Sequence, residues 1–203
     1  MQLTDIRDRV RNRVGISSTD ALATDAIMTT LINDAIDTIS LKMDWPWLEA
    51  SETIATVVGT TSYTPAATWR TTQRLSISDD NLLYKNPTDI AQYSAFTGYP
   101  RFFTVELAKI VLAPTPDAVY SVTHVYTKVE TDLSADADEP AVYDWAMPLV
   151  IVGAAKLLAT RLKDPSLLQM IKEEERDIEE GIKDELRRGR PFPKPRHRND
   201  WNL

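Results

Sequence analysis

The sequence predicts an α+β protein of 203 residues, built from a helical body, an inserted antiparallel β domain and an extended C-terminal arm. Apolar residues recur at helical spacing near both ends of the chain, whereas β-branched residues and turn signals dominate its middle. The last seventeen residues are basic and rich in proline. Hydrophobic residues make up 43% and charged residues 26% of the chain, as is usual for globular proteins, so most of it is expected to fold.

Residues 1–48 are expected to form two helices of the body. In the first, Thr4 is placed to cap the N-terminus, an apolar residue recurs every fourth position, and Gly15 is placed to end the helix. The second follows Thr24 and has an apolar stripe of helical period: Met28, Leu31, Ile32, Ala35, Ile36, Ile39 and Met43. It should end near Trp45-Pro46-Trp47, because the residue before a proline avoids the helical conformation. These two tryptophans are expected in the core, with an intersubunit contact as the alternative.

Residues 49–138 are expected to form the β domain. The segment TIATVVGTTSYTP predicts a hairpin that turns at its glycine, and QRLSISDDNLLYK predicts a second hairpin that turns at Asp79–Asn81. A short helix is expected after Pro87, followed by up to three more strands. Their inward-facing candidates are Val105, Leu107, Ile110, Leu112, Val119, Val122 and Val125. Six or seven short strands predict an antiparallel meander, either a small sandwich or a partly closed barrel.

Residues 139–186 are expected to complete the body with two further helices. Pro140 suits the first turn of one helix, and Pro148 either kinks this helix or marks its true start. An Asp-Pro pair separates it from the last helix, whose narrow apolar stripe comprises Leu167, Leu168, Ile171, Ile178, Ile182 and Leu186. Glu179 and Lys183 are correctly ordered for an i,i+4 ion pair, and the run EEERDIEE is expected to be a solvated helix face.

The composition argues against most catalytic and cofactor sites. The chain has no cysteine and two histidines, and His124 lies in an expected strand without a second metal ligand nearby, so a structural role is expected for it. No glycine-rich phosphate loop occurs, and the longest apolar run is about half as long as a bilayer span requires. We therefore expect no metal, no cofactor, no membrane span and no catalysis. A cell-wall-degrading enzyme, which would need two carboxylates facing each other in a cleft, is a minor alternative.

Charge is distributed unevenly along the chain. Residues 187–203 carry six Lys or Arg and one acid, a net charge of +5, whereas residues 1–186 carry seventeen basic and twenty-nine acidic side chains, a net charge of −12. The prolines of the basic segment disfavour helix and central strand, so we expect an extended arm. Its expected docking residues combine cations for acidic partners with apolar anchors: Arg187, Arg188, Arg190, Phe192, Lys194, Arg196, Arg198, Trp201 and Leu203.

Two other interpretations of this basic segment stay open. A DNA-binding accessory protein would use the same cations on phosphates, and its affinity would fall steeply with salt. A disordered, solubilising end would have no partner at all.

Three blocks of the sequence resemble the head-to-tail adaptor (connector, or head-completion) proteins of tailed bacteriophages. The block DWPWLEASETIATVVGTTSYTP carries the resemblance at Trp45, Pro46, Trp47, Thr53, Ile54, Thr56, Val57, Gly59, Tyr63 and Pro65. The block GYPRFFTVELAKIVLAPTPDAVYSVTHVYTK carries it at Gly98, Pro100, Ile110, Leu112, Pro114, Pro116, Tyr120 and Tyr126. The third block has Pro140 opening a helix and a GAA segment at 153–155, so the resemblance spans about residues 24–163. The chain departs from the family pattern between Pro65 and Arg70.

The resemblance implies a structural virion protein that forms a ring, usually of twelve copies, beneath the portal. Such rings join the head to the tail, prolong the DNA channel without binding DNA specifically, and give tail, nozzle or tail-terminator proteins a place to attach. The C-terminal segments of the family commonly extend to grip the portal, which implies that residues 187–203 are a portal-docking arm. The expected location is the head–tail interface of the virion, after synthesis in the cytoplasm of the host bacterium.

Overall fold

The structure is a computed structural model that describes residues 1–189. The chain divides into two compact units. A helical unit combines residues 1–42 with the chain from residue 131 onward, and a β unit comprises residues 43–130. The fold is therefore α+β, as the sequence predicts, with the β unit inserted between the second and third long helices.

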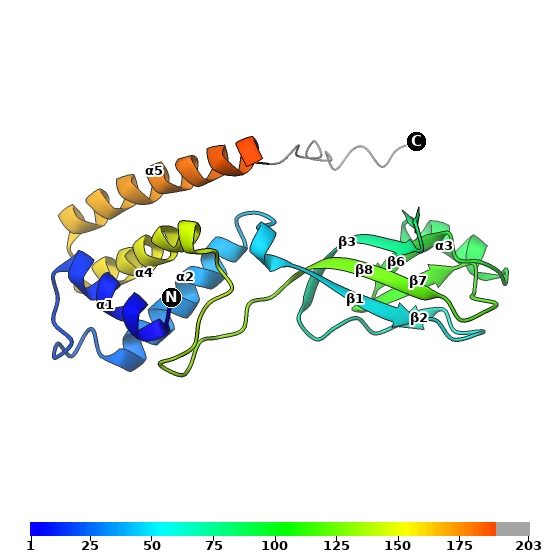
Figure 1. Cartoon of the computed structure of the whole chain (residues 1–203), viewed down its shortest axis with the longest axis horizontal. Helices are drawn as coiled ribbons and strands as arrows, with labels where there is room; N and C mark the ends of the chain where they lie inside the picture. Colours follow the sequence, from blue (N-terminus) through cyan, green and yellow to red (C-terminus); the bar gives the residue numbers. More distant parts are fainter. Residues whose placement is uncertain (190–203) are drawn as a thin grey trace. The chain divides into compact units, whose positions relative to one another are not determined.

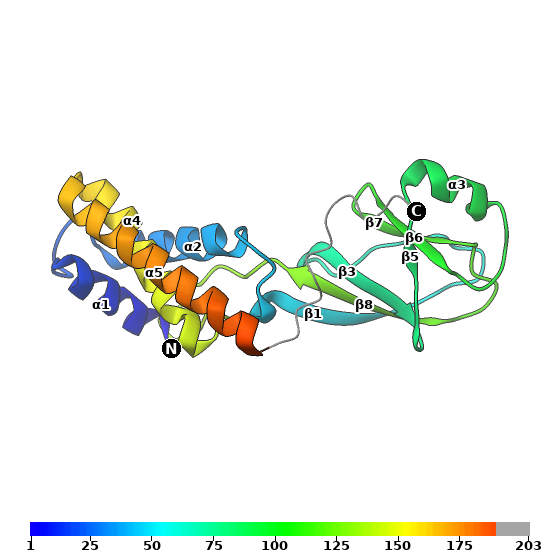
Figure 2. The ribbon, with the colours of Figure 1, turned by 90° about the horizontal axis from the view of Figure 1, so that it is seen from above.

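The helical unit is built around α4. Figures 1 and 2 show its helices, α1 (Leu3–Val14), α2 (Asp25–Ser40), α4 (Met147–Leu162) and α5 (Pro165–Gly189). The short 3-10 turn η2 (Asp144–Ala146) directly precedes α4. Helix α4 packs against α1, α2 and α5, which explains why it is apolar on almost every side. Pro148 occupies the first turn of α4 and so marks its start rather than a kink.

The start of α1 differs from the expectation that Thr4 caps it. The helix already begins at Leu3, with Gln2 in the capping position. The Leu3 amide donates instead to the carbonyl oxygen of Asp138 at 2.8 Å, and the Thr4 hydroxyl donates to the carbonyl oxygen of Asp136 at 3.1 Å. Tertiary hydrogen bonds to the segment before α4 therefore replace a side-chain cap. The other end follows the sequence, because Gly15 ends α1 in the left-handed conformation with φ of 75°.

Gly153 is the point of closest approach between α4 and α2. A Cβ atom at this position would lie 3.3 Å from Ala35 Cβ and 3.6 Å from Ile39 Cδ1. The absence of a side chain thus lets the two helices pack at short distance.

This contact predicts opposite effects for two glycine substitutions. Gly153→Val should lower the free energy of unfolding by about 1–3 kcal/mol, because its methyl groups overpack the α2–α4 contact. Gly181→Ala should raise it by about 0.5–1 kcal/mol, because Gly181 lies within α5 with open space around it. Urea unfolding followed by circular dichroism measures both. Equal effects of the two substitutions would contradict the assigned helix contact.

The β unit contains two four-stranded sheets. One has the order β1 (Glu49–Ala55), β8 (Ser121–Lys128), β3 (Trp69–Ile77) and β4 (Asp80–Asn81). The other has the order β2 (Ser62–Tyr63), β7 (Lys109–Ala113), β6 (Phe102–Glu106) and β5 (Leu83–Tyr84). All neighbouring strands are antiparallel except β5 and β6. The unit also includes the 3-10 turn η1 (Pro46–Leu48) and the helix α3 (Pro87–Ser94), the short helix expected after Pro87.

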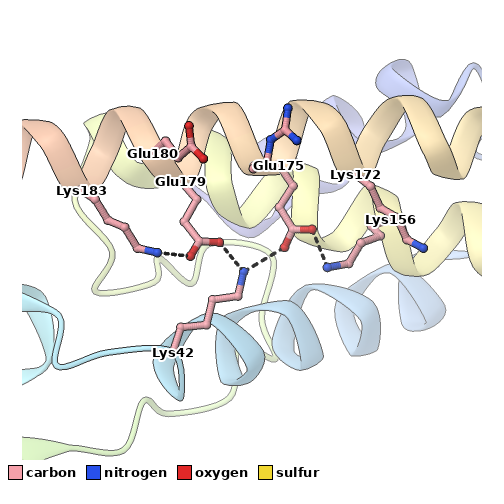
Figure 3. Close-up of a pocket in the computed structure, with 8 residues that line it drawn as sticks. Lys42, Lys156, Lys172, Glu175, Glu179, Glu180 and Lys183 are labelled. Carbon is pink, nitrogen blue, oxygen red and sulfur yellow. Dashed lines mark hydrogen bonds and ion pairs between the residues drawn. The ribbon is translucent and has the colours of Figure 1, made fainter.

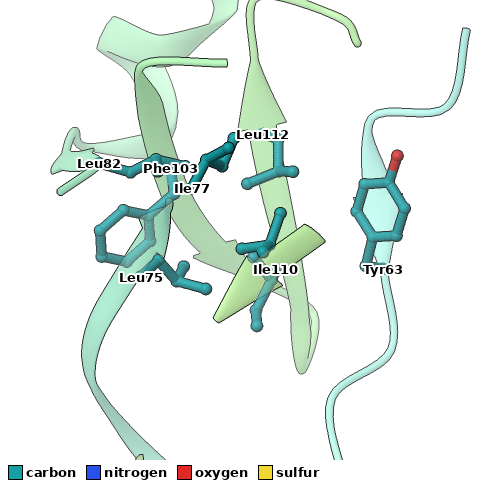
Figure 4. Close-up of a cluster of buried hydrophobic side chains, with 8 residues drawn as sticks. Tyr63, Leu75, Ile77, Leu82, Phe103, Ile110 and Leu112 are labelled. Atoms are coloured by element: carbon teal, nitrogen blue, oxygen red, sulfur yellow. The ribbon is translucent and has the colours of Figure 1, made fainter. Parts of the chain in front are cut away.

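Side chains from both sheets meet in one apolar cluster, shown in Figure 4. Its buried members are Tyr63, Leu75, Ile77, Leu82, Phe103, Ile110, Leu112 and Val122. A shared core between two sheets identifies the unit as a small sandwich, one of the two arrangements expected. Trp45 and Trp47 belong to the same unit and stack with their ring centroids 4.5 Å apart, both almost completely buried.

The expected hairpin in TIATVVGTTSYTP is wrong. Strand β1 pairs with β8 and β2 pairs with β7, so the segment crosses from one sheet to the other. Gly59 turns this crossing with φ of 78°, and its amide donates to the carbonyl oxygen of Pro116 at 2.9 Å. The second expected hairpin is present as β3–β4. Its pair Ile77↔Asp80 places the turn at Ser78 and Asp79, one residue earlier than expected.

The inward-facing candidates divide into three groups. Ile110, Leu112 and Val122 are buried, and Val105 and Val125 are half-buried. Leu107 and Val119 are 93% and 71% exposed, contrary to the expectation. The pair Glu106↔Lys109 makes Leu107 the first residue of a two-residue turn, which explains its exposure.

The stretch Asp144–Leu162 is long and apolar enough to cross a membrane, by length and composition alone. In the structure 61% of it is buried inside the helical unit, and α1, α2 and α5 all contact α4. Core packing therefore accounts for its apolar composition.

Candidate functional site

Helix α5 is rich in charged residues and leads into the basic segment. It starts after Asp164, whose carboxylate accepts a hydrogen bond from the Leu167 amide at 3.0 Å and so caps the helix. Only a narrow stripe of the helix is buried, represented by Ile171 and Ile182. The rest of α5 is available for polar contacts.

The helix continues beyond the expected start of the arm. Arg187 and Arg188 belong to the last turn of α5, and the Arg187 guanidinium contacts the Asp184 carboxylate at 3.2 Å with both side chains largely exposed. The expected extended segment would thus begin after Gly189. The other expected docking residues lie outside the described residues: Arg190, Phe192, Lys194, Arg196, Arg198, Trp201 and Leu203.

A network of ion pairs connects α5 to α4 and to Lys42, which follows the end of α2. The Glu175 carboxylate, 10% exposed, contacts the Lys42 ammonium at 3.1 Å and the Lys156 ammonium at 2.6 Å. The Glu179 carboxylate contacts Lys42 at 2.7 Å and Lys183 at 2.6 Å. Figure 3 shows the resulting chain of alternating charges, which we call the α5 charge cluster. The Glu175 carboxylate lies in the apolar stripe of α5 and pairs with Lys156 on α4 and with Lys42, which follows the end of α2.

The cluster shifts the pKa values of its members. Burial would raise the pKa of Glu175, but hydrogen bonds from Lys156 and Lys42 outweigh it and leave the pKa below its ordinary value. The pKa of Glu179 is also below its ordinary value, because hydrogen bonds from Lys183 and Lys42 outweigh the effect of burial. Burial would lower the pKa of Lys42, but its hydrogen bonds to Glu179 and Glu175 raise the pKa. All three groups are therefore charged at neutral pH.

The cluster borders a hollow of about 270 Å³ on the surface of the helical unit. Its lining residues are Lys42, Lys156, Lys172, Glu175, Arg176, Glu179, Glu180 and Lys183, which makes five cations against three carboxylates. We call this the α5 hollow. Because its lining is almost entirely charged, it suits a polar or ionic group rather than an apolar ligand.

The sequence predicts part of this site. The i,i+4 pair of Glu179 and Lys183 is present. Glu175, however, was assigned to a solvated face and is instead buried. Its position gives the missing signal, because it lies four residues after Ile171 and seven before Ile182, in line with the buried stripe.

His124 has no accessible surface, and its hydrogen bonds account for it. Its Nδ1 lies 2.8 Å from a Glu52 carboxylate oxygen, and its Nε2 lies 3.0 Å from the Thr72 hydroxyl. The ring therefore ties β8 to its neighbours β1 and β3. Complete burial of the His124 ring denies a substrate access to it, which agrees with the structural role expected for His124. Among residues 1–189, no group of three or more potential ligands could hold a metal ion.

Comparison with known proteins decides the family. A family model described as SU10 adaptor protein matches residues 1–196, nearly the whole chain. The chain belongs to the SU10 adaptor protein family. This family is a phage head-to-tail adaptor family, which confirms the resemblance seen in the sequence. Comparison with curated proteins finds no match.

Membership in the SU10 adaptor family defines the general role of the chain. It is a structural adaptor protein of a bacteriophage, a virion component of the head–tail junction. The family implies contacts with portal and tail components and a role without catalysis.

Proposed function

We propose that this adaptor forms a ring of twelve copies beneath the portal, prolongs the DNA channel and docks on the portal through its C-terminal arm. The match to the adaptor family over residues 1–196 carries this proposal, because it includes α5 and the first part of the basic segment. Tail, nozzle or tail-terminator proteins would attach on the other side of the ring.

Charge and valency support the same assignment. Residues 187–203 have a net charge of +5 and three apolar anchors, a combination suited to an acidic protein surface with pockets. A ring presents many such arms at once, so a modest affinity of each arm gives a strong overall attachment. The net charge of −12 on residues 1–186 favours a lumen that repels DNA phosphates and lets the genome slide. The helical units would pack side by side, and ring contacts would become stable only on the symmetric portal.

The docking role of the arm predicts a difference between two chain lengths. Full-length protein should co-sediment with purified portal rings at low and moderate salt, whereas a chain ending at Gly189 should not. The shorter chain keeps all of α5, so its loss of binding would be due to the arm alone. Full-length protein with Phe192→Ala and Trp201→Ala is the matched test of the anchors, because it keeps every cation of the arm.

The alternative DNA-binding function gives a different pattern in this experiment. If neither chain binds the portal while the full-length chain shifts duplex DNA only at low salt, the cations act on phosphates. Binding of the shorter chain to the portal would also contradict the proposed arm. Stable rings of the isolated protein in sedimentation would contradict portal-templated assembly.

A further inference from the structure

The α5 hollow is lined by more cationic side chains than carboxylates, so part of its positive charge is not neutralised within the hollow. Lys172 has no ion-pair partner within residues 1–189, and Figure 3 shows its ammonium without a contact to the cluster. Arg176 is 69% exposed, and among the described residues its one ion-pair partner is its neighbour Asp177, at 3.5 Å. The other lysines of the hollow are already paired with Glu175 and Glu179. Lys172 and Arg176 therefore remain available to an anionic group, although the chain as a whole is acidic.

The helical unit also contains carboxylates that have no ion-pair partner among the described residues. Asp34 and Asp37 are exposed on α2, and no Lys or Arg of the described chain forms an ion pair with them or with Asp132. Burial, together with the negative charges of Asp132 and Asp34, raises the pKa of Asp37. A double hydrogen bond between the Asn33 side chain and the backbone of Leu133, at 3.0 and 3.1 Å, holds this segment against α2. The three aspartates, which we call the acidic triplet, are thus close together and fixed in place.

The positions of the two features suit a contact between copies. The hollow is lined mainly by residues of α5, whereas two members of the acidic triplet lie on α2 and the third lies on the loop that leads to α4 (Figure 1). A contact that joins two different surfaces of identical chains is heterologous, and repeated rotation by the same angle closes it into a ring. Each copy would then both provide and receive the missing charge.

We propose that the α5 hollow binds the acidic triplet of a neighbouring copy of this chain, with Lys172 and Arg176 facing Asp34, Asp37 and Asp132. The inference rests on the proposed ring function and names one contact between its subunits. A second copy is the partner that we infer, because its acidic triplet supplies carboxylates without an ion-pair partner to match Lys172 and Arg176. Exposed ion pairs contribute little affinity individually, so the contact gives specificity and orientation more than strength.

The contact can be tested on the full-length protein without portal. Copies labelled with heavy nitrogen are mixed with unlabelled copies at high concentration and low salt, and a carbodiimide joins carboxylates directly to lysines in ion-pair contact. Mass spectrometry should find Lys172 linked to the acidic triplet between a heavy and a light chain. Arg176→Glu should reduce the yield of links between Lys172 and the triplet about tenfold, because a like charge then faces the triplet while the Lys172 amine stays available to react. Lys109→Glu, an exposed charge reversal in the β unit, should leave this yield unchanged.

Charge exchange provides the decisive control. Asp132→Lys should reduce the yield as Arg176→Glu does. When the two single variants are mixed, the unchanged hollow of one and the unchanged triplet of the other should again form links between a heavy and a light chain. Three results would each overturn the proposal. Lys172 could form links within one chain only, it could form no links to the triplet, or short duplex DNA could suppress the links. If these links are absent but the protein still co-sediments with the portal, only the proposed interface between copies is wrong. Links between copies with no portal binding instead count against the docking arm.

Discussion

Replacing Leu112 with alanine is expected to lower the free energy of unfolding of the β unit by about 3 kcal/mol. Leu112 is 1% exposed and belongs to the cluster shared by the two sheets. Its partner in the register is Phe103 on β6, so the substitution opens a cavity next to a large ring. Urea unfolding followed by circular dichroism measures the loss. Hydrogen exchange should place it in the strands of residues 43–130 rather than in α4.

Leu107→Ala is the matched control for this prediction. Both leucines lie in the β6–β7 region and both are inward-facing candidates by sequence, but Leu107 is 93% exposed. Its replacement should change the free energy of unfolding by less than about 0.5 kcal/mol. Similar losses for the two variants would show that the shared core has been assigned incorrectly.

The contrast between these leucines shows which parts of the fold the sequence can predict. Helical features depend on residues near one another in the chain, so the end of α1 at Gly15 and the apolar character of α4 are predictable. Strand pairing depends on distant residues. The register Ile54↔Val122 joins segments far apart in sequence, and no local pattern distinguishes it from a hairpin between β1 and β2.

The candidate site shows the same division between local and distant contacts. The pair Glu179 and Lys183 is within one helix and follows from spacing. Glu175 instead pairs with Lys42, from which it is separated by 133 positions, so composition places it in a solvated acidic run. Arg7 and Arg11 are buried for a similar reason, since their partners lie on α2 and in the loops around it. A charged residue in a polar run is buried only when a partner from another element reaches it.

Replacing Glu175 with glutamine is expected to lower the free energy of unfolding of the helical unit by about 2 kcal/mol. Loss of a fully buried ion-pair partner costs about 3–5 kcal/mol and loss of an exposed one up to about 1 kcal/mol. Glu175 is 10% exposed and its lysines are 28% and 24% exposed, which places the pair between these limits. Lys42 keeps Glu179, whereas Lys156 loses its carboxylate. Glu173→Gln, on the exposed side of α5, should have almost no effect.

The difference in unfolding free energy between wild type and Glu175→Gln should depend on pH, because folding shifts the pKa of Glu175. Because folding lowers the pKa of Glu175, its contribution is present above the pKa of the unfolded chain and disappears as pH falls through the lower folded value. The stability gap between wild type and Glu175→Gln should therefore be full at neutral pH and close in acid. A gap that is constant down to strongly acidic pH would mean that the carboxylate charge is not its cause.

A double-mutant cycle with Lys156 separates the ion pair from the shape of the side chain. Lys156→Met keeps most of the apolar stem and removes the ammonium, so Glu175→Gln in this background no longer leaves a half-buried cation without its anion. The double variant should then lose less stability than the sum of the two single variants, by about 1 kcal/mol. Additive losses would mean that Lys156 and Glu175 act independently. A coupled result would instead establish that the ion pair between Glu175 and Lys156 helps to hold α5 against α4.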